Sequence, residues 1–481
     1  MLFNSYEYIF AFLPIVFILY FELCKIRISY AKIALILASI FFYAYWKLEY
    51  LPILLGSVVF NFTLGNLIRE DKLKNFAPKK WVLIFGIISN LALLGYYKYA
   101  DFFIDNVNAV LGSNYNSLNL LLPLAISFFT FQQITYLVDS YKGEINKHSF
   151  LSYTLFVTFF PQLIAGPIVH HREMIPQFES KSNWIKDYQN IVMGLFIFSI
   201  GLFKKVMIAD QFAIWATQGF DGANALSLLE AWATSLSYTF QLYFDFSGYT
   251  DMAIGAALLF NIRLPMNFNS PYKAFNIQDF WRRWHMTLTR FLTEYIYIPL
   301  GGNRHGELRT YINIMLVFLI GGLWHGAGWT FIFWGFLHGV ALTIHRIWGS
   351  LKFSMPKWVA WFITFNFVNI AWVFFRANNF DDALKVLKGM FSGDIVLPQV
   401  LAGKLSFLQS YGIEFASIAS VTPFSILFIG AGLLIVLFTK NSMEQLQSEV
   451  VSTTKILYSA VLFSISVLSF YKVSEFIYFN F

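Results

Sequence analysis

The 481-residue sequence contains little charge and a single cysteine. Asp, Glu, Lys and Arg make up 13% of the residues, about half the usual share of about 25%, whereas 57% are hydrophobic. A soluble protein could not bury this much apolar surface, so the composition predicts a polytopic membrane protein. Because Cys24 has no partner cysteine, an intramolecular disulfide and a cysteine-based zinc site are excluded. Histidines and carboxylates must therefore carry any polar chemistry.

Several widespread functional motifs are also missing. The sequence has no P-loop, no dinucleotide-binding glycine motif and no H-E-x-x-H zinc motif. Ser247 does not lie in a G-x-S-x-G turn, which argues against a serine hydrolase. The net charge of +7 comes from short basic clusters between apolar runs, where Lys and Arg set membrane topology. We therefore expect no nucleic-acid partner, no metal and no permanently bound cofactor.

The N-terminal apolar run, Tyr8–Leu23, is expected to be a retained membrane anchor. It follows Glu7 rather than a basic residue, and no small-residue cleavage site comes after it, so a signal peptide is not indicated. Basic residues follow the run at Lys25, Arg27 and Lys32. The positive-inside rule then places the N-terminus outside and the first loop in the cytoplasm. The basic loop Arg69–Lys80 is consistent with this orientation.

Thirteen further apolar runs follow, and several are shorter than the roughly 20 residues that a membrane crossing requires. We expect about 11–13 crossings, with the remaining pieces broken or re-entrant. Irregular backbone at membrane depth is tolerated only where it is buried in protein or lines a wet cavity, so the short runs predict an internal chamber. No internal repeat is found. The runs are 31–46, 51–68, 81–97, 121–138, 150–165, 188–203, 226–243, 251–260, 311–324, 329–348, 357–375, 421–438 and 455–471.

His325 stands out among the eight histidines because it lies deep in an uncharged stretch between Arg309 and Arg346. A helix would place it about 24 Å from Arg309, inside the hydrocarbon layer. The whole stretch would be about 57 Å long as one helix, too long for one crossing, so 326–328 (Gly-Ala-Gly) is expected to break it. An ionisable residue at that depth is a functional-site hypothesis. The alternative is a neutral histidine that hydrogen-bonds a neighbouring helix.

The other histidines are less informative. His170 and His171 are adjacent, and adjacent residues on a helix point in different directions, so we interpret them as loop residues at an interface rather than a metal site. His148 is expected to be solvated. His338 and His345 are seven residues apart and share a helix face, which packing explains as well as function does.

Residues 276–309 interleave aromatic and cationic side chains, as in an amphipathic helix at the cytoplasmic surface. This segment could anchor the protein to anionic lipids. It could also receive an anionic donor, because phosphate groups favour arginine and adenine favours an aromatic face. Both interpretations remain open, and His285 lies on the same segment.

Two carboxylates, Asp245 and Asp251, lie inside the apolar stretch 241–258. Carboxylates in hydrocarbon need partners or protonation. We expect a structural hydrogen-bonding role and keep a proton relay as the alternative.

Five segments together resemble the membrane-bound O-acyltransferase family, in the branch that contains alginate and peptidoglycan O-acetyltransferases. They are FFPQLIAGPI (159–168), FDFSGYTDMAIG (244–255), FWRRWHMTL (280–288), YIPLGGNR (297–304) and GGLWHGAGW (321–329). The C-terminal EFIYFNF is similar to that branch as well, with Asn480 where Gln is expected. The likeness extends along a single integral domain, 1–481. We divide it into N-terminal helices (1–119), a catalytic core (120–376) and a C-terminal loop with helices (377–481).

The resemblance implies an all-α ring of about 11–13 transmembrane helices, with re-entrant and interfacial helices, around a tunnel through the membrane. It makes His325 the catalytic histidine and His285 the second signature residue. His325 would act as a general base or form a transient acyl-histidine, and His285 would orient the thioester or hydrogen-bond its carbonyl oxygen. The residues expected to bind the donor are Trp281, Arg282, Arg283, Trp284 and Trp324.

The resemblance also implies an O-acetyltransferase of the bacterial cytoplasmic membrane. Its donor would be acetyl-CoA or an acyl carrier thioester at the cytoplasmic face. The acetyl group would pass to a hydroxyl on a partner, an extracytoplasmic SGNH-type acetyltransferase, or directly to a polysaccharide such as an alginate-like polymer or peptidoglycan. One alternative is a D-alanyl transferase of teichoic acid synthesis that uses a carrier protein. A second is a transporter, although transporters usually carry an inverted repeat.

Overall fold

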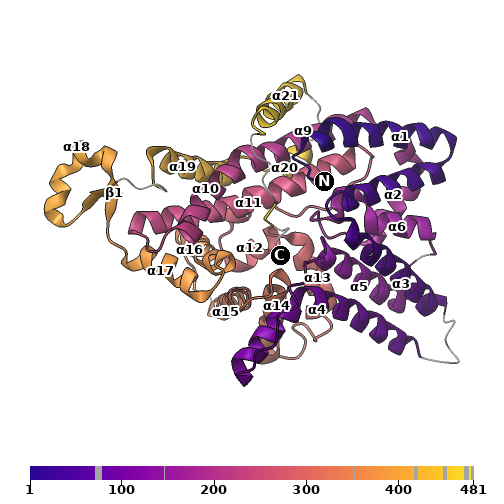
Figure 1. The fold of residues 1–481 in the computed structure, drawn as a ribbon, viewed down its shortest axis with the longest axis horizontal. Coiled ribbons are helices and arrows are strands. Elements are labelled where there is room, and N and C mark those ends of the chain that lie inside the picture. Colours follow the sequence, from indigo (N-terminus) through magenta and orange to yellow (C-terminus); the bar gives the residue numbers. More distant parts are fainter. Residues whose placement is uncertain are drawn as a thin grey trace. The chain divides into compact units, whose positions relative to one another are not determined.

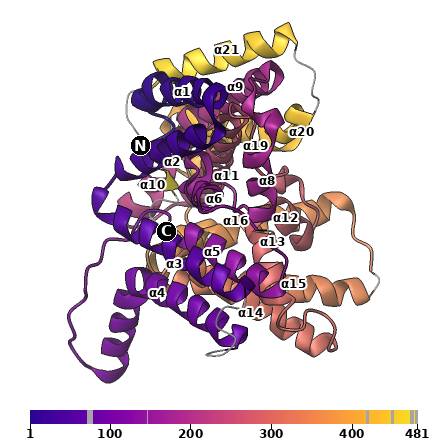
Figure 2. The same cartoon turned by 90° about the vertical axis from the view of Figure 1, so that its right-hand side faces the viewer.

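The computed structural model describes residues 1–70, 78–145, 147–351, 353–416, 421–447, 452–470 and 476–477. These residues are mostly helical (Figures 1 and 2), and their two strands, β1 (Val396–Pro398) and β2 (Glu414–Ala416), pair in parallel. The predicted all-α class is therefore confirmed. Most of the basic loop 69–80 and of the C-terminal motif 475–481 lies outside the described residues.

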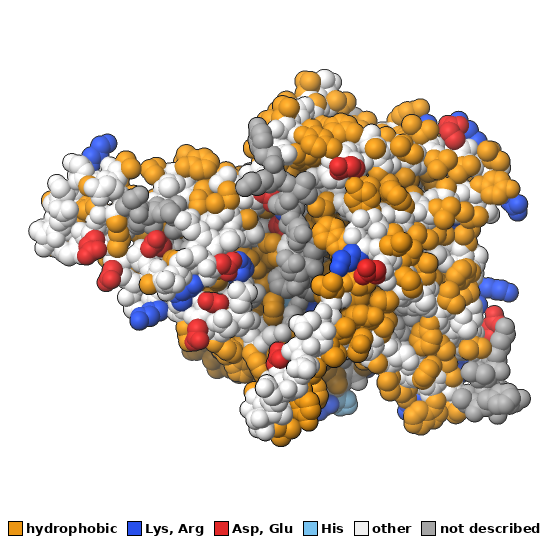
Figure 3. All heavy atoms as spheres, viewed as in Figure 1, with side chains coloured by type: hydrophobic (Ala, Val, Ile, Leu, Met, Phe, Trp, Pro, Cys, Tyr) orange, Lys and Arg blue, Asp and Glu red, His pale blue; other side chains and the backbone are white. Residues whose placement is uncertain are grey.

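Within the described residues, six helical stretches are long and apolar enough to cross a membrane. Three shorter apolar helices accompany them, α2 (Ile28–Ala44), α19 (Pro423–Phe438) and α21 (Thr453–Leu468). Figure 3 shows hydrophobic side chains over much of the visible face, as expected for a surface that contacts lipid. The protein is thus a multi-pass membrane protein, and the number of crossings stays a prediction. The six stretches are Glu7–Ile26, Leu48–Glu70, Lys79–Leu111, Tyr188–Gly222, Glu307–His325 and Lys357–Arg376.

The chain forms two compact units, and the first comprises Met1–Leu202, Tyr249–Met266 and Ser448–Asn480. In this unit α1 packs on α2, α5 packs on α3 and α4, and α8 packs on α6. A glycine permits the close approach of α11 (Leu228–Leu258) to α9, because a Cβ at Gly255 would lie 2.6 Å from the carbonyl oxygen of Gly194. The remaining helices of the unit are α1 (Leu13–Ile26), α3 (Leu51–Glu70), α4 (Lys79–Leu111), α5 (Ile126–Lys142), α6 (Phe150–Thr158), α7 (Phe160–Leu163), α8 (His171–Glu179) and α9 (Tyr188–Phe203).

The second unit comprises Phe203–Gly248 and Asn267–Gln447. It contains His285 and His325, the two histidines expected to be functional. Helix α12 packs on both α13 and α15. Its helices, besides the first part of α11 and α19, are α10 (Asp210–Thr217), α12 (Ile277–Arg283), α13 (Met286–Leu292), α14 (Glu307–His325), α15 (Trp329–Ser350), α16 (Lys357–Arg376), α17 (Phe380–Ser392), α18 (Ala402–Leu405) and α20 (Ser442–Gln447).

Helices α14 and α15 form a tight hairpin around the predicted break. α14 ends at His325 and α15 begins at Trp329, so the break at 326–328 is confirmed. The two helices meet backbone to backbone: a Cβ on Gly322 would lie 2.3 Å from the carbonyl oxygen of Phe331. A Cβ on Gly335 would lie equally close, 2.3 Å, to the carbonyl oxygen of Phe318. Only glycine fits at these two positions, and the hairpin holds His325 at its tip.

Candidate active site

A cavity of about 310 Å³ lies within the second unit, lined by residues of α12, α13, α14 and α15 and of the segment that follows α13. Apolar side chains form most of its wall, and His325 is part of that wall. A mostly apolar pocket with a few polar groups is typical of a small-molecule site. Its other polar lining residues are Gln278, Arg282, Thr289, Thr293, Tyr297 and Arg346.

His325 is 2% exposed and lies among aromatic rings. Its ring centroid is 5.0 Å from that of Trp324 and 5.2 Å from that of Trp334, and both contacts are edge-to-face. Phe375 adds a third edge contact, at 5.1 Å. These aromatic contacts fix the orientation of the imidazole ring. A ligand in the cavity can still contact His325, because His325 is part of the cavity wall.

His285 lies next to His325, although 40 residues of chain separate them. The two ring centroids are 6.4 Å apart. His285 precedes α13 with a φ of +43°, in the left-handed region that non-glycine residues rarely adopt. Such conformations are costly and cluster at functional sites, so this outlier supports a functional role for His285. The structure thus brings the two expected histidines together.

Asn267, which no sequence pattern singled out, determines which ring nitrogen of His285 carries the proton. The Asn267 Oδ1 accepts a hydrogen bond from the backbone N–H of Thr287 at 3.3 Å and from the Thr287 hydroxyl at 2.9 Å. Because a backbone N–H can only donate, the acceptor atom must be the amide oxygen. His285 Nδ1 lies 3.0 Å from the same oxygen and therefore donates to it. The proton of neutral His285 is on Nδ1, and Nε2 carries the lone pair.

Burial lowers the pKa of His285 to about 3, so the ring is neutral at pH 7. In this tautomer Nε2 can accept a hydrogen bond but cannot donate one. The expected role of donating to a thioester carbonyl would require a protonated ring, and burial opposes that protonation. An acceptor role, in which Nε2 holds a hydroxyl or thiol near His325, fits the neutral form.

Asn267→Leu is expected to lower turnover by about 10–100-fold, because partners that orient a functional histidine typically contribute that much. The variant removes the acceptor that fixes the His285 tautomer. Asn267→Asp keeps an acceptor at the same place and should retain more activity than Asn267→Leu. The measurement is kcat and KM with reconstituted protein, and a wild-type kcat in Asn267→Leu would exclude this positioning role.

Trp281 and Arg282 are the two expected donor-binding residues that line the cavity. The Trp281 indole N–H donates to His338 Nδ1 at 3.2 Å, so the fully buried His338 holds a cavity residue in place. This contact gives His338 a packing role. Arg282 is exposed on one side, as a residue at a cavity entrance would be.

Arg346 also lines the cavity and was not identified from the sequence. Its guanidinium forms two hydrogen bonds to Glu307, at 2.9 and 3.1 Å. Its position at the end of the uncharged stretch that contains His325 could have identified it as a candidate site residue. Arg282 and Arg346 together give one cavity two cationic groups.

Three other expected donor-binding residues do not line this cavity. Arg283 instead pairs with Asp279 at 2.8 Å and donates to the backbone carbonyl of Asn269. Trp284 is buried between Phe280 and Trp372, with centroids 5.7 and 5.0 Å away. Trp324 packs against His325. For Arg283 and Trp284 these contacts favour a structural role.

Asp245 forms a buried ion pair with Lys205 at 2.6 Å. Lys205 also pairs with Asp210 at 2.8 Å, so one ammonium group serves two carboxylates. This arrangement favours the structural role for Asp245 over a proton relay. Asp251 is buried as well and belongs to the first unit.

The chain is similar to known proteins over its whole length. The sequence model of the membrane-bound O-acyltransferase family matches residues 138–380. A peptidoglycan O-acetyltransferase of Helicobacter pylori is 51% identical, over 100% of this chain and 98% of the relative. A probable alginate O-acetylase of Pseudomonas aeruginosa is 40% identical, over 85% and 78% of the two chains. A teichoic acid D-alanyltransferase of Bacillus subtilis is 28% identical, over 54% and 70%.

Proposed function

Because the chain belongs to the membrane-bound O-acyltransferase family, we propose that it transfers an acetyl group from a cytoplasmic thioester to a hydroxyl on the other side of the membrane. The observation that carries this proposal is the position of His325 in the wall of a cavity that also contains Arg282 and Arg346. One cavity thus combines a base for a hydroxyl with cations for an anionic donor.

Acetyl-CoA is the donor that we propose, with an acyl carrier thioester as the alternative. Its phosphates would lie at Arg282 and Arg346, because guanidinium groups bind phosphate with paired hydrogen bonds. Trp281 would contact the adenine or the pantetheine arm. Arg346 is already paired with Glu307 and would have to share its donors with the phosphate.

In the proposed reaction the acceptor hydroxyl attacks the thioester carbonyl while His325 removes its proton. A C–O bond forms, the C–S bond breaks, and the thiolate leaves with the proton returned from His325. His285 would accept a hydrogen bond from the hydroxyl and so position it. An acyl-histidine route would use the same residue as nucleophile.

The proposed final acceptor is an extracytoplasmic polysaccharide. The two most similar relatives named above are called a peptidoglycan O-acetyltransferase and a probable alginate O-acetylase, and both names support a polysaccharide. We propose an SGNH-type acetyltransferase as the partner that completes the transfer. We also propose the bacterial cytoplasmic membrane as the location, with the N-terminus outside.

The alternative donor is a D-alanyl carrier protein, as in teichoic acid synthesis. The relative of that name matches only about half of this chain. Both reactions need a thioester at a cavity like this one, so the donor itself must be tested. A transporter is not favoured, because the family is one of acyltransferases.

Reconstituted protein should transfer radiolabelled acetyl from acetyl-CoA, and not D-alanine from its carrier protein, to a hydroxyl acceptor. Arg282→Gln should raise the KM for acetyl-CoA about tenfold with little change in kcat, since a charged hydrogen bond contributes about 1.5 kcal/mol or more. Arg309→Gln, an exposed arginine that does not line the cavity, is the matched control. Transfer from the D-alanyl carrier alone would refute the acetyl-CoA proposal.

A further inference from the structure

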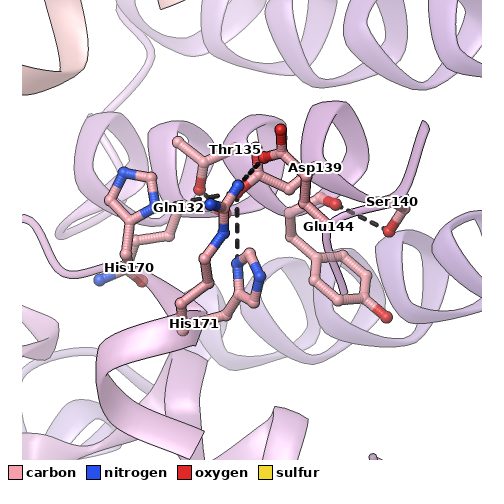
Figure 4. A network of polar contacts seen from close by, with 9 residues as sticks. Gln132, Thr135, Asp139, Ser140, Glu144, His170 and His171 are labelled. Carbon is pink, nitrogen blue, oxygen red and sulfur yellow. Dashed lines mark hydrogen bonds and ion pairs between the residues drawn. The ribbon is translucent and has the colours of Figure 1, made fainter. Parts of the chain in front are cut away.

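A second polar cluster lies in the first unit, where α5 meets the start of α8 (Figure 4). Asp139 comes from α5, His170 directly precedes α8, and His171 is its first residue. All three side chains are buried. One ligand atom from each lies within 4.8 Å of the other two. This cluster has no part in the proposed acetyl transfer.

The two histidines converge, contrary to the expectation from the sequence. Their rejection as metal ligands rested on the divergence of adjacent side chains on a helix, and both were interpreted as loop residues. His170 is instead in extended conformation (φ −96°, ψ 142°), and only His171 is helical. The chain therefore turns between them, and Nδ1 of each ring lies 3.8 Å from Oδ2 of Asp139.

A separation of 3.8 Å is too long for a hydrogen bond. It suits two ligands of one metal ion: at metal–ligand distances of about 2.0–2.2 Å, atoms on the same ion lie about 3.4 Å apart at a tetrahedral angle and up to about 4.2 Å at a wider one. Neither ring nitrogen of His171 has a hydrogen-bond partner among the described residues.

We propose that Asp139, His170 and His171 bind a divalent transition-metal ion. Two imidazoles and one carboxylate suit zinc, with a water molecule as the fourth ligand. The ion would join α5 to the chain entering α8, two segments that the sequence separates by about 30 residues.

Arg172 would compete with the metal for the same carboxylate. Its Nη2 lies 3.0 Å from Oδ2 of Asp139, and it also pairs with Glu144. The Arg172 side chain is 46% exposed, so it can turn away to Glu144 and solvent. Because two cations repel at one carboxylate, removing the guanidinium should strengthen metal binding. An ordinary ion-pair cluster would not respond in this way.

The test is titration of the purified full-length protein, freed of metal with a chelator, with Co²⁺ as a spectroscopic substitute for Zn²⁺. We expect one Co²⁺ per chain, with the intense visible absorption of a tetrahedral site, displaced by Zn²⁺. His171→Ala and Asp139→Asn should weaken binding more than about 100-fold. Arg172→Gln keeps all three ligands and should bind about tenfold more tightly.

His148→Ala is the matched control, because His148 is a neighbouring histidine that does not belong to the cluster. It should bind Co²⁺ like the wild type. The proposal is overturned if wild type and Arg172→Gln both give no such absorption, or if His171→Ala gives the wild-type spectrum. If the ligand variants fail to fold, Arg172→Gln still decides: tighter binding supports the site, and unchanged or weaker binding refutes it.

Discussion

His325→Ala is expected to lower the rate of acetyl transfer by about 10³-fold, within the usual contribution of a general base or acid. His325 is the one histidine among the described residues of the cavity wall, and three aromatic contacts hold its ring there. Alanine leaves the acceptor hydroxyl without a base while the cavity and its arginines remain. KM for the donor should therefore change far less than kcat. The measurement is steady-state transfer by protein reconstituted in lipid.

His305→Ala is the matched control for this experiment, because His305 is exposed and lies outside the cavity wall. It should transfer acetyl at the wild-type rate. A normal rate in His325→Ala would refute the base assignment. A denaturation curve for each variant separates loss of chemistry from loss of fold.

Lys205→Met is expected to destabilise the second unit by about 3–5 kcal/mol, since removing one partner of a buried ion pair leaves the other charge uncompensated. The affected carboxylate is that of Asp245, whose side chain is 1% exposed. Replacing both partners, in Lys205→Met with Asp245→Leu, should recover much of the loss. Thermal unfolding in detergent measures the difference.

Substitution of Asp245 in this ion pair distinguishes a structural role of the carboxylate from a role as a proton relay. Asp245→Asn should reduce thermal stability while the correctly folded fraction keeps its kcat. A proton relay predicts the reverse, a normal unfolding temperature and a large fall in kcat. Equal stability of Lys205→Met and wild type would show that the ion pair contributes nothing to the fold.

The features that depend on composition and local chain geometry could be predicted from the sequence. The low charge predicted the membrane helices, and the glycines at 326 and 328 predicted where the hairpin turns. The distance along a helix from Arg309 placed His325 inside the hydrocarbon layer and made it the leading candidate for a functional residue. These arguments need only residue type and the rise per residue of a helix.

Contacts between distant segments could not be predicted in this way. Asn267 contacts His285 from 18 residues away, and His285 adopts a left-handed conformation that its neighbours in the sequence do not indicate. Arg282 and Arg283 look alike in the sequence, but one faces the cavity and the other pairs with Asp279. The approach of His170 and His171 to Asp139 could not be predicted, because the sequence does not show that α8 begins between the two histidines.

The glycine contacts between α14 and α15 have a consequence for evolution of this enzyme. Any side chain at 322 or 335 would need the opposite backbone to retreat, and the imidazole at the tip would move with it. Reshaping the hairpin would therefore demand simultaneous substitutions on both helices. Changes in acyl-chain preference should arise more readily from the other walls of the cavity, where single replacements leave His325 in place.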